Sequence, residues 1–228
     1  MPDPNLPLLE DAVRKLAPFL DEIVFVGGVT LGLLITDEAA APIRGTTDVD
    51  VIAEIVTYAD YIAFSERLRQ AHFTEDQGEE PLTCRWHNGK LTLDVLALNK
   101  EVLGFTNIWY EPALRHASTL TLPGGRSIRV ITAPFFLATK MEAFRGRGKM
   151  DFQASHDLED FVAVIEGREA VMQEIAESPQ DVRDYLAQAA KTLLAEPRFL
   201  DVLPGFVLDY GRVPLIEKRL ASIAVGAQ

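Results

Sequence analysis

The segment R-G-T-T-D-V-D-V-I, residues 44–52, limits the possible folds of this chain more than any other stretch. Its polar and apolar residues alternate, which is typical of a β-strand with one face in solvent. The alternation places Asp48 and Asp50 on the same side of the strand, where two like charges repel. The segment therefore predicts either an exposed polar strand face or a bound cation.

The first part of the chain alternates between strand and helix patterns. E-I-V-F-V predicts a buried strand that stops at Gly27-Gly28, with a helix to follow. L-T-C-R-W-H-N-G-K-L-T-L-D-V-L predicts a hairpin whose turn uses Asn88-Gly89 for positive φ. S-I-R-V-I predicts another strand, and helical spacing is expected over 8–20 and 58–72.

The later part of the chain shows only helical patterns. Thr132 can cap a helix that begins near Pro134, and Ser155 opens a further helix that Gly167 closes. We expect a mixed α/β (α+β) fold in two regions. Residues 1–131 would form the α/β core, with a mixed sheet flanked by helices, and residues 132–228 a helical C-terminal region that completes the active site.

Charge and composition restrict the classes of function. The net charge of −12 opposes broad electrostatic binding to nucleic acid. A local anion site is still compatible with it, because residues 126–149 hold six basic side chains and one acid, a charge of +5 (Arg126, Arg129, Lys140, Arg145, Arg147 and Lys149, against Glu142). The single cysteine excludes an internal disulfide. With no secretory signal and no apolar run long enough to span a bilayer, we expect a cytoplasmic protein without membrane partners.

Three features of the α/β region could converge. Gly27 and Gly28 end the first strand without side chains, so that a ligand can approach the backbone. Asp48 and Asp50 lie on the second strand, and Asp94 lies on the second strand of the hairpin. Three converging carboxylates suit Mg²⁺, which takes oxygen ligands and supports phosphoryl displacement. Taken singly, the glycines could be a simple tight turn, and Asp94 could pair with a nearby Arg or Lys.

Taken in order, these residues resemble the DNA polymerase β-like nucleotidyltransferase superfamily. G-G before a helix, T-T-D-V-D-V and T-L-D-V-L carry the resemblance. The long gap before the aspartate pair, preceded by Arg44, is more similar to the AbiEii-type toxin branch, although Val29-Thr30-Leu31 stands where that branch more often has Thr-Ala-Leu. Lys140 and Asp157 match a later lysine and aspartate of the branch. The resemblance covers about residues 23–167.

The resemblance implies a role for each matched residue. Asp48 and Asp50 would bind Mg²⁺, and Asp94 would complete the metal site or accept a proton from the attacking hydroxyl. Lys140 would neutralise charge on the triphosphate, and Asp157 would support the site or act as a base. The phosphates would be held by Gly27, Gly28 and Thr30. For Asp157, the structural interpretation is preferred, because an acid in a first helical turn interacts favourably with the helix dipole.

The implied reaction is Mg²⁺-dependent transfer of NMP from an NTP to a hydroxyl, with release of pyrophosphate. The branch implies a toxin acting on RNA, such as a tRNA 3′ end, with a cognate antitoxin as partner. Two alternatives remain. One is transfer to a small hydroxyl compound, as in antibiotic-modifying relatives. The other is a catalytically inactive module that senses nucleotide or binds a partner.

Overall fold

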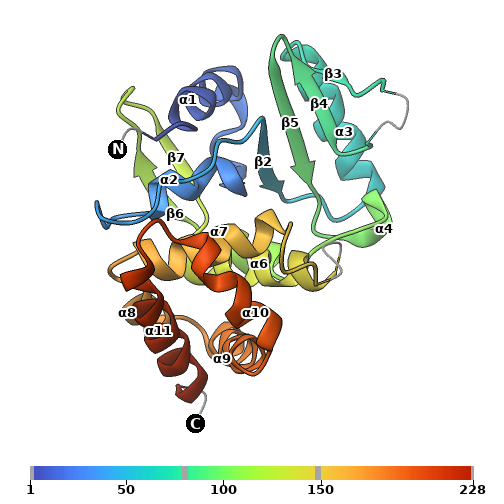
Figure 1. The fold of residues 1–228 in the computed structure, drawn as a ribbon. Helices are drawn as coiled ribbons and strands as arrows, with labels where there is room; N and C mark the ends of the chain where they lie inside the picture. Colours follow the sequence, from blue (N-terminus) through green and yellow to red (C-terminus); the bar gives the residue numbers. More distant parts are fainter. Residues whose placement is uncertain (1–2, 79–81, 147–149, 227–228) are drawn as a thin grey trace. The chain divides into compact units, whose positions relative to one another are not determined.

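The computed structural model describes residues 3–78, 82–146 and 150–226 (Figure 1). The chain divides into two units. Residues 3–32 and 44–132 form the sheet unit, and residues 33–43 and 133–226 belong to the helical unit.

A mixed sheet forms the centre of the sheet unit, and within the described residues it has seven strands in the order β3-β4-β5-β2-β1-β7-β6. The pairs β2–β5 and β1–β7 are parallel, and the other neighbours are antiparallel. This confirms the predicted mixed sheet. The strands are β1 Ile23–Val26, β2 Asp48–Ala53, β3 Thr74–Glu75, β4 Arg85–Asn88, β5 Leu91–Leu96, β6 Ser118–Thr121 and β7 Ser127–Val130.

Helices flank this sheet. Helix α1 contacts β2 and β5 and buries Leu9, Ala12 and Val13 at helical spacing. Helix α3 begins with a capping box in which Thr57 and Asp60 satisfy each other's backbone N–H groups. The helices of this unit are α1 Leu6–Lys15, η1 Ala17–Phe19, η2 Gly28–Thr30, α3 Tyr58–Gln70, α4 Lys100–Leu103 and α5 Tyr110–Arg115; α2 Leu31–Leu34 spans the boundary between the units.

The predicted hairpin is confirmed, but its turn lies one residue later than expected. Asn88 is the last paired residue of β4 and lies opposite Leu91, so the two-residue loop is Gly89-Lys90. Gly89 has a φ of +62°. A glycine at the first of two loop positions supplies the positive φ that matches the twist of the strands.

The helical unit contains the described C-terminal part of the chain, which confirms the predicted helical region. The hydroxyl of Ser155 accepts a hydrogen bond of 3.2 Å from the N–H of Leu158, as expected for the cap of α7. No helix in the described chain is long and apolar enough to cross a membrane. The elements are α6 Ala133–Arg145, α7 His156–Gly167, α8 Val171–Glu177, α9 Gln180–Leu194, α10 Pro197–Val202, η3 Leu203–Phe206, η4 Tyr210–Arg212 and α11 Val213–Val225.

Gly167 has a different role from the predicted helix terminator. It is the last residue of α7 itself and does not have positive φ. A Cβ at this position would lie 2.9 Å from side-chain atoms of Ala40 and Ile35. The glycine is therefore needed for the close approach of segment 33–43 to the end of α7.

Candidate functional site

The turn after β1 requires glycine for two reasons. Gly27 has φ 69° and ψ −165°, a conformation essentially restricted to glycine. A Cβ at Gly27 would also lie 2.0 Å from Oδ2 of Asp50. The carboxylate of Asp50 therefore lies directly against the backbone at the end of β1.

The register of four neighbouring strands places acids and a base in one row. Val26 of β1 is opposite Asp50 of β2, Asp50 is opposite Asp94 of β5, and Asp94 is opposite Arg85 of β4. Paired residues on adjacent strands point to the same face of a sheet. Asp48 lies two residues before Asp50 and shares that face. The three acids singled out by the sequence thus lie on one face, and Arg85 lies beside them.

Arg85 binds two of these acids. Its Nε donates to Oδ1 of Asp94 at 2.8 Å and its Nη2 to Oδ2 of Asp94 at 2.7 Å, a bidentate pair. The same Nη2 lies 3.4 Å from Oδ2 of Asp48. The hydrogen bonds that Arg85 donates to Asp94 raise the pKa of Arg85, aided by the charges of Asp94 and Asp48 and opposed by desolvation. The structure therefore confirms that Asp94 pairs with a nearby base, Arg85.

Asp48 is held on its other side by the segment that leads into β2. The hydroxyl of Thr46 donates to Oδ1 of Asp48 at 2.7 Å. The Asp48 side chain is 33% exposed, whereas that of Asp94 is only 11% exposed. Asp48 is therefore fixed in position and accessible from solvent, while Asp94 is largely covered.

Asn5 fixes the glycine turn to this same segment, and sequence reasoning missed it. Its buried side chain donates from Nδ2 to the carbonyls of Gly28 (3.2 Å) and Arg44 (3.1 Å). Its Oδ1 accepts from the N–H of Thr46 at 2.9 Å. One amide side chain thus connects the end of β1 to the residues before Asp48.

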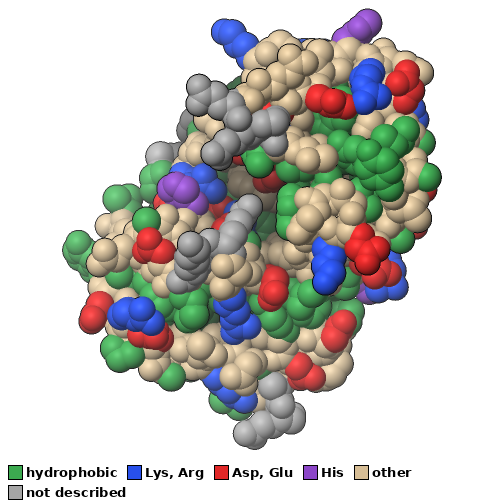
Figure 2. Space-filling view, turned by 90° about the vertical axis from the view of Figure 1, so that its right-hand side faces the viewer, with side chains coloured by type: hydrophobic (Ala, Val, Ile, Leu, Met, Phe, Trp, Pro, Cys, Tyr) green, Lys and Arg blue, Asp and Glu red, His purple; other side chains and the backbone are tan. Residues whose placement is uncertain are grey.

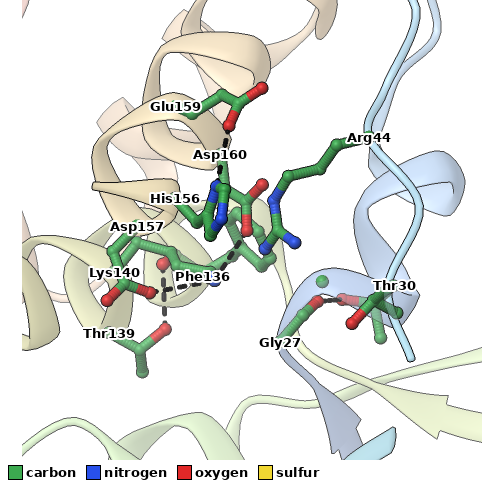
Figure 3. Close-up of polar contacts among 12 residues, drawn as sticks. Gly27, Thr30, Arg44, Phe136, Thr139, Lys140, His156, Asp157, Glu159 and Asp160 are labelled. Atoms are coloured by element: carbon green, nitrogen blue, oxygen red, sulfur yellow. Dashed lines mark hydrogen bonds and ion pairs between the residues drawn. The ribbon is translucent and has the colours of Figure 1, made fainter. Parts of the chain in front are cut away.

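Thr30 was expected to offer its hydroxyl to phosphate. In the structure Thr30 is fully buried, and its Oγ1 donates to the carbonyl of Gly27 at 2.9 Å (Figure 3). The hydroxyl therefore stabilises the turn. Phosphate binding at this turn stays a prediction for Gly27 and Gly28.

Lys140 belongs to a second cluster, within the helical unit (Figure 3). Its Nζ lies 3.1 Å from Oδ1 of Asp157 and 2.7 Å from Oδ2 of Asp160. Asp160 is fully buried, and Lys140 is 7% exposed. Asp157 and Asp160 are three residues apart on α7, the spacing that places two side chains on one helix face. Sequence reasoning missed Asp160 although this spacing was visible.

Asp157 has two structural roles, and its catalytic role stays a prediction. Asp157 lies in the first turn of α7, where an acid favours the helix dipole, and it is also an ion-pair partner of Lys140. Lys140 and Asp157 belong to the helical unit, whereas the glycine turn and Asp48 belong to the sheet unit. Joint action of these residues on a triphosphate stays a prediction.

The basic window of residues 126–149 is divided between the two units. Arg129 donates to the carbonyls of Leu114 (2.8 Å) and Asp21 (3.3 Å), and Arg145 lies over the ring of Tyr185 at 5.2 Å. Arg147 and Lys149 lie outside the described residues. On the face shown in Figure 2, basic side chains are interspersed with acidic ones. Arg129 and Arg145 are therefore each engaged by groups of their own unit.

The carboxylates of this sheet face could hold a divalent cation whose remaining ligands are substrate phosphates and water. Mg²⁺ is commonly held by one or two carboxylates together with substrate phosphates and water. Asp48 and Asp50, on one face, supply that pair. In the part of the chain that the structure describes, no group of three His, Cys, Asp or Glu side chains is placed to share a metal. Both oxygens of Asp94 accept from Arg85, so a metal would share this carboxylate with the guanidinium.

No family model matches the chain, and no curated protein matches it. Among solved structures, a protein of H. pylori that is provisionally named a nucleotidyltransferase is similar to it. The two are 12% identical, the match covers 98% of this chain and 94% of the other, and the TM-score is 0.48. The function is therefore inferred from the residues of the site.

Proposed function

We propose that this protein is a nucleotidyltransferase, which transfers NMP from an NTP to a hydroxyl acceptor and releases pyrophosphate. One observation carries the proposal. The carboxylate of Asp50 lies against the glycine turn at Gly27, on the same sheet face as the half-exposed Asp48. A carboxylate pair for a cation thus adjoins a turn without side chains, where an anion can approach the backbone.

The residues divide the work as follows. Asp48 and Asp50 would hold Mg²⁺, which when bound supplies positive charge to the triphosphate and orients it. The hydroxyl oxygen of the acceptor forms a bond to the α-phosphorus, and the bond from that phosphorus to the bridging oxygen breaks, releasing pyrophosphate. Asp94 is the proposed acceptor of the hydroxyl proton, through an oxygen to which Arg85 also donates.

For the acceptor we propose an RNA hydroxyl, with the tRNA 3′ end as the first to test. The resemblance to the AbiEii-type toxin branch is the support for this choice, and a cognate antitoxin is the corresponding partner. A net charge of −12 favours a small contact with one RNA end over an extended footprint. A small cationic hydroxyl compound is the alternative acceptor that the same charge would suit.

The bidentate pair of Arg85 and Asp94 favours a second candidate function. A nucleotide-binding module without transfer activity could keep Asp94 permanently paired and still bind nucleotide through Asp48 and Asp50. This module would sense nucleotide or present a surface to a partner. It predicts Mg²⁺-dependent nucleotide binding in the absence of any transfer.

Calorimetry with each of the four NTPs, with and without Mg²⁺, tests the proposal directly. We expect Mg²⁺-dependent binding to the native protein and its loss in Asp48→Asn. Glu54→Gln, directly after the far end of β2, removes an acid outside the site and serves as the matched control. Unchanged binding in Asp48→Asn would overturn the site.

An assay with α-labelled NTP then separates the two candidate functions. Label transferred to RNA, and lost in Asp50→Asn, supports the transferase. Nucleotide binding without transfer to RNA or to small hydroxyl acceptors supports the binding module instead.

A further inference from the structure

The two edge strands of the sheet, β3 and β6, are protected to different degrees (Figure 1). β3 has only two residues, and the carboxylate of Glu75 in it accepts from Arg69. β6 has four residues, and the segment 117–123 around it, A-S-T-L-T-L-P, contains no charged side chain. Short length and charge are two of the features that keep an edge strand from pairing with another chain. β3 has both, whereas β6 is longer and uncharged.

The hydrogen bonds at the end of the hairpin show which backbone groups of β6 point outward. The N–H of Leu122 donates to the carbonyl of Arg126 at 2.9 Å, so these two residues form a hydrogen-bonded pair. Such pairs alternate along an antiparallel ladder, and Leu120 therefore also directs its backbone groups toward β7. The N–H and C=O groups of Thr119 and Thr121 point away from β7, toward the open side of the sheet.

These outward groups have no hydrogen-bond partner within the residues that the structure describes. All four residues of β6 are exposed, and the side chain of Leu120 at its centre is among the exposed large apolar ones, at 37%. The edge of β6 thus presents backbone donors and acceptors on both sides of an apolar side chain.

The sequence of β6 is complementary to a second copy of itself. Antiparallel pairing about a two-fold axis at Leu120 places Thr119 opposite the partner's Thr121, and Thr121 opposite the partner's Thr119. These are the residues with outward backbone groups, so each pair exchanges both N–H···O bonds. Leu120 lies opposite the partner's Leu120 in the closer, non-hydrogen-bonded arrangement. No like charges meet along the strand, and Pro123, which has no N–H, ends the ladder.

We propose that β6 is a dimer interface, at which a second copy of this chain extends the sheet by antiparallel pairing of the two β6 strands. The occupant is a second copy because one register satisfies the outward groups of both strands with identical residues, the isologous contact of a two-fold dimer. The ladder is short, and each copy carries a net charge of −12, so we expect a reversible dimer that forms in moderate salt. The inference does not depend on the proposed function.

Sedimentation equilibrium over a range of protein concentrations tests the inference. We expect a monomer–dimer equilibrium for the native protein. Leu120→Lys places two ammonium groups opposite each other in place of two leucines, and is expected to raise the dissociation constant about tenfold or more. Leu208→Lys adds the same charge at a leucine that is 76% exposed in the helical unit, and should keep the native dissociation constant.

Mixing two charge variants tests whether Leu120 contacts itself across the axis. Leu120→Glu alone is expected to dissociate like Leu120→Lys. An equal mixture of the two is expected to associate again, because opposite charges then lie in the directly opposed positions. A mixture that stays monomeric overturns the proposed register.

Thr119→Pro tests the backbone ladder without touching the leucine contact. It removes one outward N–H and no bond to β7, since proline is tolerated at such positions of an edge strand. We expect loss of the dimer, and in the native protein we expect the amide exchange of Thr119 and Thr121 to slow as concentration rises. Circular dichroism checks the fold of each variant, and the Leu120 variants decide the question even where Thr119→Pro is unfolded. A native protein that stays monomeric at every concentration, or a dimer that Leu120→Lys leaves unchanged, overturns the inference.

Discussion

Two clusters in this chain each join one base to two aspartates, in different surroundings. In the sheet unit, Arg85 joins Asp94 and Asp48; in the helical unit, Lys140 joins two aspartates of α7. Side-chain exposure is 28% for Arg85 and 33% for Asp48, but 9% for Lys140. The sheet unit therefore has a base with two acids on a solvent-accessible sheet face, and the helical unit has a base with two acids in its core.

The difference in burial determines what each cluster can do. An accessible acid can exchange an arginine for a cation and water, because solvent stabilises the intermediate states. A buried acid cannot exchange its basic partner for a cation and water in this way. Removing one partner of a buried ion pair leaves an uncompensated charge in a medium of low dielectric constant. We infer that the sheet cluster is the one able to bind ligand, and that the first consequence of altering the Lys140 cluster is on stability.

Lys140→Met tests this contrast with the largest expected effect. It removes the ammonium that lies 2.7 Å from the fully buried Asp160, which is expected to lower the free energy of unfolding by about 3–5 kcal/mol. Urea denaturation followed by circular dichroism measures it. Lys218→Met, at an exposed position of α11, is the matched control and should change stability by less than about 0.5 kcal/mol.

Equal stability of the two lysine variants would remove the distinction between the clusters. If Lys140→Met were as stable as Lys218→Met and transfer alone were lost, Lys140 would regain the role on the triphosphate that the family resemblance implies. The measurement thus decides between the two interpretations of one residue.

Gly27→Ala tests how closely the sheet cluster adjoins the turn. The new Cβ would occupy a strained backbone conformation and overlap Oδ2 of Asp50, at a cost of about 2–3 kcal/mol. Gly125→Ala is the control, since it also has positive φ, +82°, but a Cβ there meets nothing within 4 Å. Thermal unfolding of both variants separates the backbone strain from the overlap with Asp50. Equal losses would mean that Asp50 moves away without cost.

Much of the framework follows from local patterns in the sequence. The strands β1, β2 and β5 and the helices α6 and α7 were predictable because their apolar residues repeat with strand or helix spacing. β3 and β6 were not predicted. They have two and four residues, and all of these are exposed. β3 is too short to show a period, whereas the alternation of Thr119, Leu120 and Thr121 in β6 was visible and was missed.

The candidate site was less accessible to prediction than the fold. The acids on β2 and β5 stand out because charge interrupts apolar runs. Counting back along the hairpin from the predicted turn at Asn88-Gly89 would have placed Thr83 opposite Asp94, so Arg85 became visible only with the observed register. Asn5 could not be predicted, because its partners lie 23, 39 and 41 residues away and no local pattern connects them.

Asn5→Ala tests whether the sheet cluster depends on that long-range contact. Loss of the amide leaves the carbonyls of Gly28 and Arg44 and the N–H of Thr46 without this partner, at an expected cost of about 1–2 kcal/mol. Asn5→Asp keeps the acceptor for Thr46 but buries a carboxylate against both carbonyl oxygens, so a larger loss than in Asn5→Ala is expected. Chemical denaturation measures both. Native stability in Asn5→Ala would show that the turn and the segment before β2 hold their positions independently.

Cys84, the neighbour of Arg85, gives the smallest effect and reports on burial beside the sheet cluster. Burial raises the pKa of its thiol from 9.0 to about 11, with a contribution from the negative charge of Asp94. Between these values the unfolded chain loses the proton and the folded chain keeps it, so stability falls as pH rises. The loss at pH 10 is about 1 kcal/mol. Comparing the native protein with Cys84→Ala from pH 8 to pH 10.5 cancels the lysines and tyrosines that also titrate there. We expect the native protein to lose more stability over this range. Parallel curves would mean that the thiol ionises as readily in the fold as in water, and that the strand beside Arg85 is open to solvent.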